Sequence, residues 1–117
     1  MLKNTTITEQ KMSSFTTYDE LVKYSQSNPA KLIVIDFKAT WCGPCKAIKP
    51  FFNYLKENYP NVEFHEFDIE DESTMSITEN FEITKVPTFI YFKNGTVCHS
   101  TIGTNKENIE NAINDNI

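Results

Sequence analysis

Two cysteines separated by two residues are the part of this sequence best suited to chemistry. Residues 41–45 read Trp-Cys-Gly-Pro-Cys, so Cys42 and Cys45 can close a small disulfide ring or bind a metal ion. Their spacing alone does not distinguish these two roles. A third cysteine, Cys98, lies far along the chain beside His99. Three cysteines do not make a disulfide framework, and a close pair is then typical of a catalytic or metal-binding site.

The residues on either side of the pair favour a reactive thiolate. The run from Leu32 to Phe37 is apolar except for Asp36, which is typical of a strand covered on both faces. Pro44 suits the first turn of a helix, where the N–H that proline lacks has no partner in any case. Cys42 is therefore expected at a helix N-terminus, where unpaired N–H groups and the helix dipole favour negative charge.

This position predicts different roles for the two sulfurs. A free thiol with a pKa near 8.5 is only about 3 % thiolate at pH 7, and the thiolate is the attacking form. Lowering the pKa to about 7 would raise that fraction to roughly half, a shift of about 2 kcal/mol. We expect Cys42 to be the nucleophile. Cys45, one turn into the helix and facing inward, is expected to be the resolving thiol.

Helical patterns flank the motif on both sides. Thr17 and Glu20 have the spacing of a capping box, which predicts the start of a first helix. A second helix is expected from Pro44 to about Asn58, with a kink at Pro50 because proline removes one backbone hydrogen bond.

The remaining elements alternate between strands and helices. Asn94-Gly95 between two strand-like runs is the strongest short-range signal for a hairpin. The order predicts one α/β domain with a mixed sheet, because alternating elements pair in parallel and the hairpin adds an antiparallel strand. The expected segments are a weak edge strand within Thr8–Phe15, strands at Val62–Ile69, Thr88–Lys93 and Thr96–Ile102, a helix at Ser73–Asn80, and a closing helix capped by Thr104 and Glu107.

Composition excludes several classes of function. The chain has 117 residues, enough for one domain, and a net charge of -5 with no arginine, which argues against a nucleic-acid surface. Its longest aliphatic run, Leu32–Ile35, is far short of a membrane span. Residues 1–10 resemble no signal or transit peptide and are expected to form a flexible leader before a domain at 11–117. We expect a cytoplasmic monomer.

The string from Asp36 to Lys46 resembles the active-site stretch of the thioredoxin family. Further matches to that family are Pro50, Val86-Pro87-Thr88, Phe92-Lys93-Asn94-Gly95 and Gly103. The resemblance covers about Phe15 to Ile117. It implies the thioredoxin fold, with a central mixed five-stranded sheet in the order 1-3-2-4-5 flanked by four helices. It also implies reduction of disulfides in target proteins, with re-reduction by an NADPH-dependent thioredoxin reductase.

The resemblance also implies roles for single residues. Gly43 and Pro44 would set the redox potential of a Cys42–Cys45 disulfide, with no bound cofactor and no metal. Asp36 would accept the proton of Cys45. The target-binding residues would be Trp41, Val86, Pro87 and Gly103. Pro87 would follow a cis peptide bond that places Val86 against the dithiol, and Trp41 and Gly103 would complete a flat apolar rim.

Two departures from the family pattern concern the charges near Asp36. Lys38 stands where many members have an aromatic residue, and Glu66 stands where bacterial members commonly have lysine. We expect Glu66 to lie on the neighbouring strand and to raise the pKa of Asp36, with Lys46 opposing it. In a purely structural role, Asp36 would only bond a hydroxyl group or a water molecule.

The same residues leave three further functions open. Zinc binding is one, with Cys42, Cys45, Cys98 and His99 as ligands, but adjacent strand residues such as Cys98 and His99 point to opposite faces. We expect Cys98 to be a half-buried apolar side chain. The second is a thioredoxin-fold binding module with a regulatory dithiol, and the third is an oxidant or isomerase.

Overall fold

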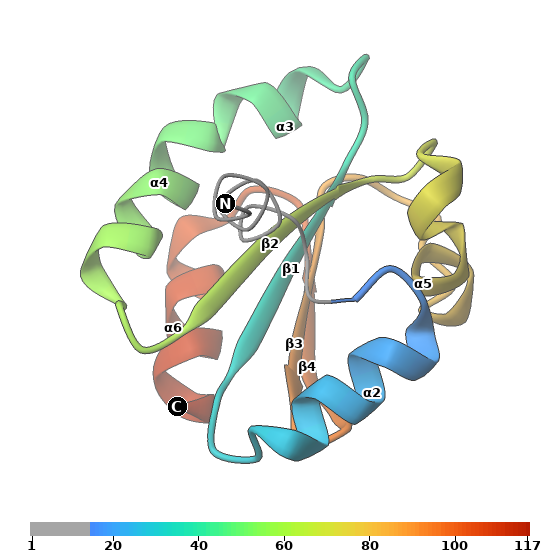
Figure 1. Ribbon diagram of the computed structural model, residues 1–117. Helices are drawn as coiled ribbons and strands as arrows, with labels where there is room; N and C mark the ends of the chain where they lie inside the picture. Colours follow the sequence, from blue (N-terminus) through green and yellow to red (C-terminus); the bar gives the residue numbers. More distant parts are fainter. Residues whose placement is uncertain (1–14) are drawn as a thin grey trace, which may run out of the picture.

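The computed structural model describes residues 15–117 (Figure 1). In chain order, the elements are α2 (Tyr18–Ser27), β1 (Ile33–Lys38), α3 (Gly43–Ala47), α4 (Lys49–Asn58), β2 (Glu63–Asp68), the 3-10 helix η1 (Glu72–Thr74), α5 (Met75–Asn80), β3 (Thr88–Lys93), β4 (Thr96–Ile102) and α6 (Lys106–Asn116).

A mixed sheet in the order β2-β1-β3-β4 forms the centre of the molecule. β1 runs parallel to β2 and antiparallel to β3, and β4 runs antiparallel to β3. Helices α4 and α6 cover one face of the sheet, while α2 and α5 cover the other (Figure 1). Both faces of β1 are therefore buried, as its nearly continuous apolar sequence predicted.

Alternation along β1 determines which core each residue enters. Ile33, Ile35 and Phe37 belong to the core beneath α2 and α5, while Val34 packs in the core beneath α4 and α6. Asp36 has the same orientation as Val34, because successive strand side chains point to opposite faces. This carboxylate therefore occupies a core position, and its side chain is only 2 % exposed.

The number of strands differs from the expectation. Residues 15–117 contain four strands rather than five, and their order agrees with that expected for the last four. The expected edge strand within Thr8–Phe15 lies outside the described residues except for Phe15. The leader at 1–10 lies wholly outside them, so the boundary at residue 11 stays a prediction.

The helix expected from Pro44 is two helices, which gives five α-helices among the described residues instead of four. The break falls at Ile48, and Pro50 lies within the first turn of α4. Proline is tolerated in a first turn because its missing N–H removes no hydrogen bond there. The expected kink at Pro50 is thus a helix boundary two residues earlier.

One of the two expected caps is confirmed. Thr17 and Glu20 form the predicted capping box at the start of α2. At α6 the prediction was wrong, because Asn105 is the N-cap and its side chain accepts from the N–H of Asn108 at 3.0 Å. Asparagine is a stronger N-cap residue than threonine, which explains the shift by one position.

The described helices are all short. The longest, α6, has 11 residues, and no helix in residues 15–117 has the length and apolar character needed to cross a membrane.

Candidate active site

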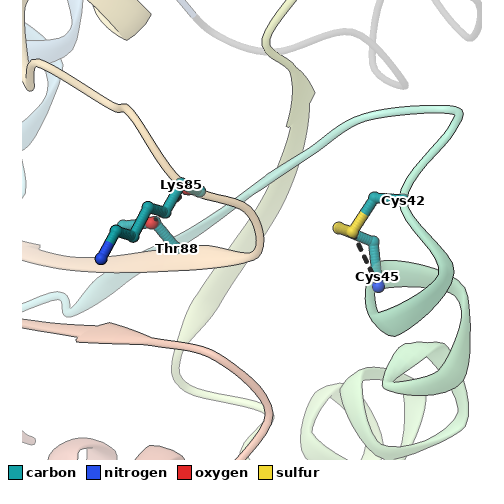
Figure 2. Close-up of a disulfide and its surroundings, with 4 residues drawn as sticks. All are labelled: Cys42, Cys45, Lys85 and Thr88. Atoms are coloured by element: carbon teal, nitrogen blue, oxygen red, sulfur yellow. Dashed lines mark hydrogen bonds between the residues drawn. A yellow bond between two sulfur atoms is a disulfide. The ribbon is translucent and has the colours of Figure 1, made fainter.

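The two cysteines lie where the chain leaves β1 and begins α3. Cys42 is the N-cap of α3, with an extended backbone, and Cys45 lies in the first turn of the helix. Their sulfurs form a disulfide, with the two Cα atoms 5.3 Å apart (Figure 2). The strand-to-helix position expected from the sequence is confirmed.

The two sulfurs have different surroundings, although both residues are largely buried. Cys42 Sγ accepts a hydrogen bond from the backbone N–H of Cys45 at 3.1 Å (Figure 2). An N–H aimed at a sulfur stabilises the thiolate more than the thiol, and so it favours negative charge on Cys42. The exposed fractions are 4 % for Cys42 and 6 % for Cys45.

The turn before β3 faces this disulfide. The Thr88 hydroxyl donates to the Lys85 carbonyl at 2.6 Å and closes the turn, which lies across from the two sulfurs in Figure 2. The Val86–Pro87 peptide bond within it is cis. Val86 packs against the small cluster that contains Cys42 and Cys45.

Gly103 is fixed beside the same turn. Its N–H donates to the Pro87 carbonyl at 2.9 Å, which ties the end of β4 to the cis proline. The φ of Gly103 is +95°, a region that glycine adopts without steric cost and that other residues rarely adopt. Added atoms would meet no neighbour at this position, so the backbone conformation alone requires glycine.

Trp41 is the most exposed member of the expected rim. Its side chain is 63 % exposed, and its Nε1 donates to Glu70 Oε2 at 3.1 Å. Glu70 was not expected near the site from the sequence, because it lies in the turn after β2, 29 residues further along the chain. No local pattern relates two residues so far apart.

Asp36 has the most perturbed acid–base properties near the site. Burial, first, and the negative charge of Glu66, second, raise its pKa to about 7, while Lys38 and Lys49 oppose that rise. Glu66 is its register partner on β2, as expected. Oδ1 of Asp36 has no hydrogen-bond partner among the described residues, so a role limited to bonding a hydroxyl group is not supported.

The lysines that oppose Glu66 differ from the expectation. Lys49 Nζ lies 2.6 Å from Glu66 Oε1, and Lys38 Nζ lies 4.0 Å from the same oxygen. Lys46 was expected in this role, but it has no ion pair among the described residues, and the charges that lower the pKa of Asp36 are those of Lys38 and Lys49. A cavity of about 780 Å³ opens beside these groups, lined by Lys38, Ala39, Thr40, Cys45, Lys46, Lys49, Glu66, Asp68 and Asp71.

Cys98 is exposed, whereas the two redox cysteines are buried. The prediction of a half-buried side chain was wrong, because Cys98 is exposed on β4. Tyr91 pairs with His99 and Phe92 with Val97, so Cys98 is the extra residue of a β-bulge. In residues 15–117 no three histidine, cysteine or acidic side chains gather in a way that would hold a metal ion.

Comparison with known proteins identifies one family throughout. The family model described as Thioredoxin matches residues 9–115. Human thioredoxin is 48 % identical over 85 residues, which cover 73 % of this chain and 79 % of the human protein. Thioredoxin from Ophiophagus hannah is 48 % identical over 84 residues, covering 72 % and 78 % of the two chains.

Solved structures agree with the sequence comparisons. The thioredoxin of Fasciola hepatica superposes with a TM-score of 0.77 at 31 % identity, covering 87 % of this chain and 96 % of that one. Mitochondrial thioredoxin 3 from Saccharomyces cerevisiae, in its oxidised form, gives a TM-score of 0.74 at 36 % identity, with coverage of 86 % and 92 %.

The redox group needed for the family's chemistry is part of the chain itself. Cys42 and Cys45, two residues apart, carry it as a disulfide that two electrons convert to a dithiol. The chain therefore belongs to the thioredoxin family and is a dithiol–disulfide oxidoreductase with protein-disulfide reductase activity.

Proposed function

We propose that the reaction proceeds in two steps with different roles for the two cysteines. The Cys42 thiolate attacks a target disulfide, forming a mixed disulfide and releasing one target sulfur, which takes up a proton. Cys45 then gives its proton to Asp36 and attacks the sulfur of Cys42. The Cys42–Cys45 bond forms, the mixed disulfide breaks, and the second target sulfur leaves as a thiolate that takes up a proton. Two electrons pass from the dithiol to the target.

The observation that carries this assignment is the hydrogen bond at the start of α3. Only Cys42 Sγ accepts the N–H of its partner, at 3.1 Å, so the charge of a thiolate is stabilised on Cys42. Cys45 lies one turn further on and borders the cavity. Pro44, in the first turn of α3, brings no N–H of its own to the sulfurs, which supports a role of Gly43 and Pro44 in setting the redox potential.

The role of Asp36 as proton acceptor is supported by its acid–base properties. A base is most effective when its pKa lies near the working pH, because it is then both available and strong enough. The pKa of Asp36 is about 7, so roughly half of its carboxyl groups are ionised near neutral pH. An ordinary aspartate is a much weaker base.

The target-binding residues of this proposal are Trp41, Val86, Pro87 and Gly103. Val86 packs against the redox cysteines, and the carbonyl of Pro87 accepts a hydrogen bond from the N–H of Gly103. An extended target segment would pair with the backbone of Val86, as peptides commonly pair with an exposed backbone edge. Trp41, being exposed, would then supply apolar contact area at low entropic cost.

The remaining parts of the proposal concern the surroundings of the protein. A reductase that draws electrons from NADPH would regenerate the dithiol, and the chain would act as a monomer in the cytoplasm. An exposed thiol such as Cys98 is compatible with a reducing compartment, where thiols are kept reduced.

Insulin reduction tests this function. The wild-type protein should reduce insulin disulfides when driven by NADPH and a thioredoxin reductase. Cys42→Ser should abolish turnover, while the matched variant Cys98→Ser should retain it. No turnover by the wild type, with either this system or dithiothreitol as reductant, would favour a binding module. Turnover with dithiothreitol alone would contradict only the NADPH-dependent partner.

A further inference from the structure

Charged residues alternate on two neighbouring strands beside the dithiol. In the parallel pairing of β1 with β2, Asp36 lies opposite Glu66 and Lys38 lies opposite Asp68. Residues two apart in a strand share a face, so these four side chains lie on one side of the sheet. Two carboxylates thus face each other in one row, and a lysine and an aspartate do so in the next.

Lys38 does not pair with the aspartate opposite it. Asp68 Oδ1 accepts the N–H of Glu70 at 2.8 Å and is held by its own turn. Lys38 Nζ is instead 4.0 Å from Glu66 Oε1, across the diagonal of the strand pair, which is within reach of a long side chain. Lys49 Nζ, from α4, lies 2.6 Å from the same oxygen. Glu66 therefore lies between two ammonium groups from different elements.

The contact of Lys38 with Glu66 contributes little to stability. The Lys38 side chain is 39 % exposed, and exposed ion pairs at such a distance contribute about 0–1 kcal/mol. The charge of Lys38 has a larger influence on Asp36, because that carboxyl is buried and charges act over longer distances where water is excluded. Of the two lysines that lower the pKa of Asp36, Lys38 has the larger effect.

We propose that Lys38 is a positioning residue for the resolving step. With Lys49 it holds the Glu66 carboxylate between two ammonium groups, and it thereby controls how readily Asp36 takes the proton of Cys45. This rests on the proton-acceptor role proposed above for Asp36.

Other titratable groups also lie near Asp36. Glu66 on β2 raises the pKa of Asp36, and Lys49 on α4 lowers it. On β3, Tyr91 is the titratable neighbour, and burial raises its pKa to about 12, so it stays neutral in the range where Asp36 titrates. On α3, Cys45 supplies the proton that moves.

The test follows the resolving step directly. A mixed disulfide of Cys42 with a fluorescently labelled cysteine peptide is assembled at acidic pH, where Cys45 stays protonated. Peptide release is then followed after jumps to a series of pH values across the neutral range. The variants are Lys38→Gln, Lys38→Arg, Lys46→Gln and Asp36→Asn. Lys46 is the matched control, because it lines the same cavity but forms no ion pair with Glu66.

Lys38→Gln should move the midpoint of the pH profile upward by about half a pH unit. Release would then be about threefold slower on the acid side of the midpoint and unchanged on the alkaline side. Lys38→Arg keeps the charge and should restore the wild-type midpoint. Lys46→Gln should have the wild-type profile.

Each contrary result has a distinct meaning. A wild-type midpoint in Lys38→Gln, with a changed profile in Asp36→Asn, would reject the role of Lys38 and leave the proposed function intact. Equal shifts in Lys38→Gln and Lys46→Gln would also reject it, because the effect would then be that of any nearby charge. A wild-type profile in Asp36→Asn would overturn the proton-acceptor role, and the inference with it.

Discussion

The two sides of the Cys42–Cys45 disulfide differ in burial and in charge. On the buried side, Asp36 lies on β1, the strand that leads to the disulfide; it is 2 % exposed and is paired in register with the partly buried Glu66 on β2. On the exposed side, Trp41 is 63 % exposed. In the proposed mechanism the buried side controls proton transfer, which every substrate requires. The exposed side controls which proteins bind, so changes there should depend on the substrate.

The largest effect is expected from Asp36→Asn, which removes the buried acid. The pKa of this carboxyl rises from 3.8 to about 7 on folding, so the folded protein holds the proton more tightly than the unfolded chain between these values. The contribution of Asp36 to the free energy of unfolding is therefore fully present below the lower pKa. It is lost as the pH rises through the folded pKa, by about 4 kcal/mol in total. Asparagine does not titrate and should remove this slope.

Urea unfolding at a series of pH values measures this difference. The wild-type and Asp36→Asn curves of unfolding free energy against pH should diverge between acidic and neutral pH. Parallel curves would contradict the raised pKa. At neutral pH the variant should also resolve a mixed disulfide about a hundredfold more slowly, whether the target is a protein or a small thiol.

A smaller effect is expected from a change at Pro44, which lies between the two cysteines. Pro44→His introduces an N–H donor and, when protonated, a positive charge in the first turn of α3, where both favour a thiolate. A thiolate more stable by about 1.4 kcal/mol raises the redox potential by about 30 mV, which makes the protein a stronger oxidant. The potential is measured by equilibration with glutathione, and an unchanged or lower value would reject this reasoning.

The smallest effect is expected from Trp41→Ala on the exposed side. Loss of one aromatic contact should lower kcat/KM for a protein target about fivefold, or about 1 kcal/mol. The rate with a small aromatic disulfide should stay nearly unchanged, because the dithiol itself is intact. Glu70→Gln is the control, since it weakens the hydrogen bond to Trp41 but keeps the ring. Equal losses with both substrates would remove the distinction between the two sides.

Much of the fold could be predicted because its signals are local. The hairpin at Asn94-Gly95 and the capping box at Thr17 depend on residues a few positions apart, and both were correctly expected. The helix was expected to kink at Pro50 instead of ending before Ile48, because a proline is compatible either with a kink or with the first turn of a new helix. The sequence does not distinguish these two geometries.

The position of the cysteine pair at the junction of a strand and a helix was determined by the sequence alone, since an apolar strand is followed by Cys42, Pro44 and Cys45 within fourteen residues, from Leu32 to Cys45. The choice of Lys38 and Lys49, rather than Lys46, as partners of Glu66 was decided only by the tertiary structure. So was the exposure of Cys98, because β4 is an edge strand that is exposed along almost its whole length. Such contacts depend on strand register and on how helices lie across the sheet, and these are set by the packing of the whole core.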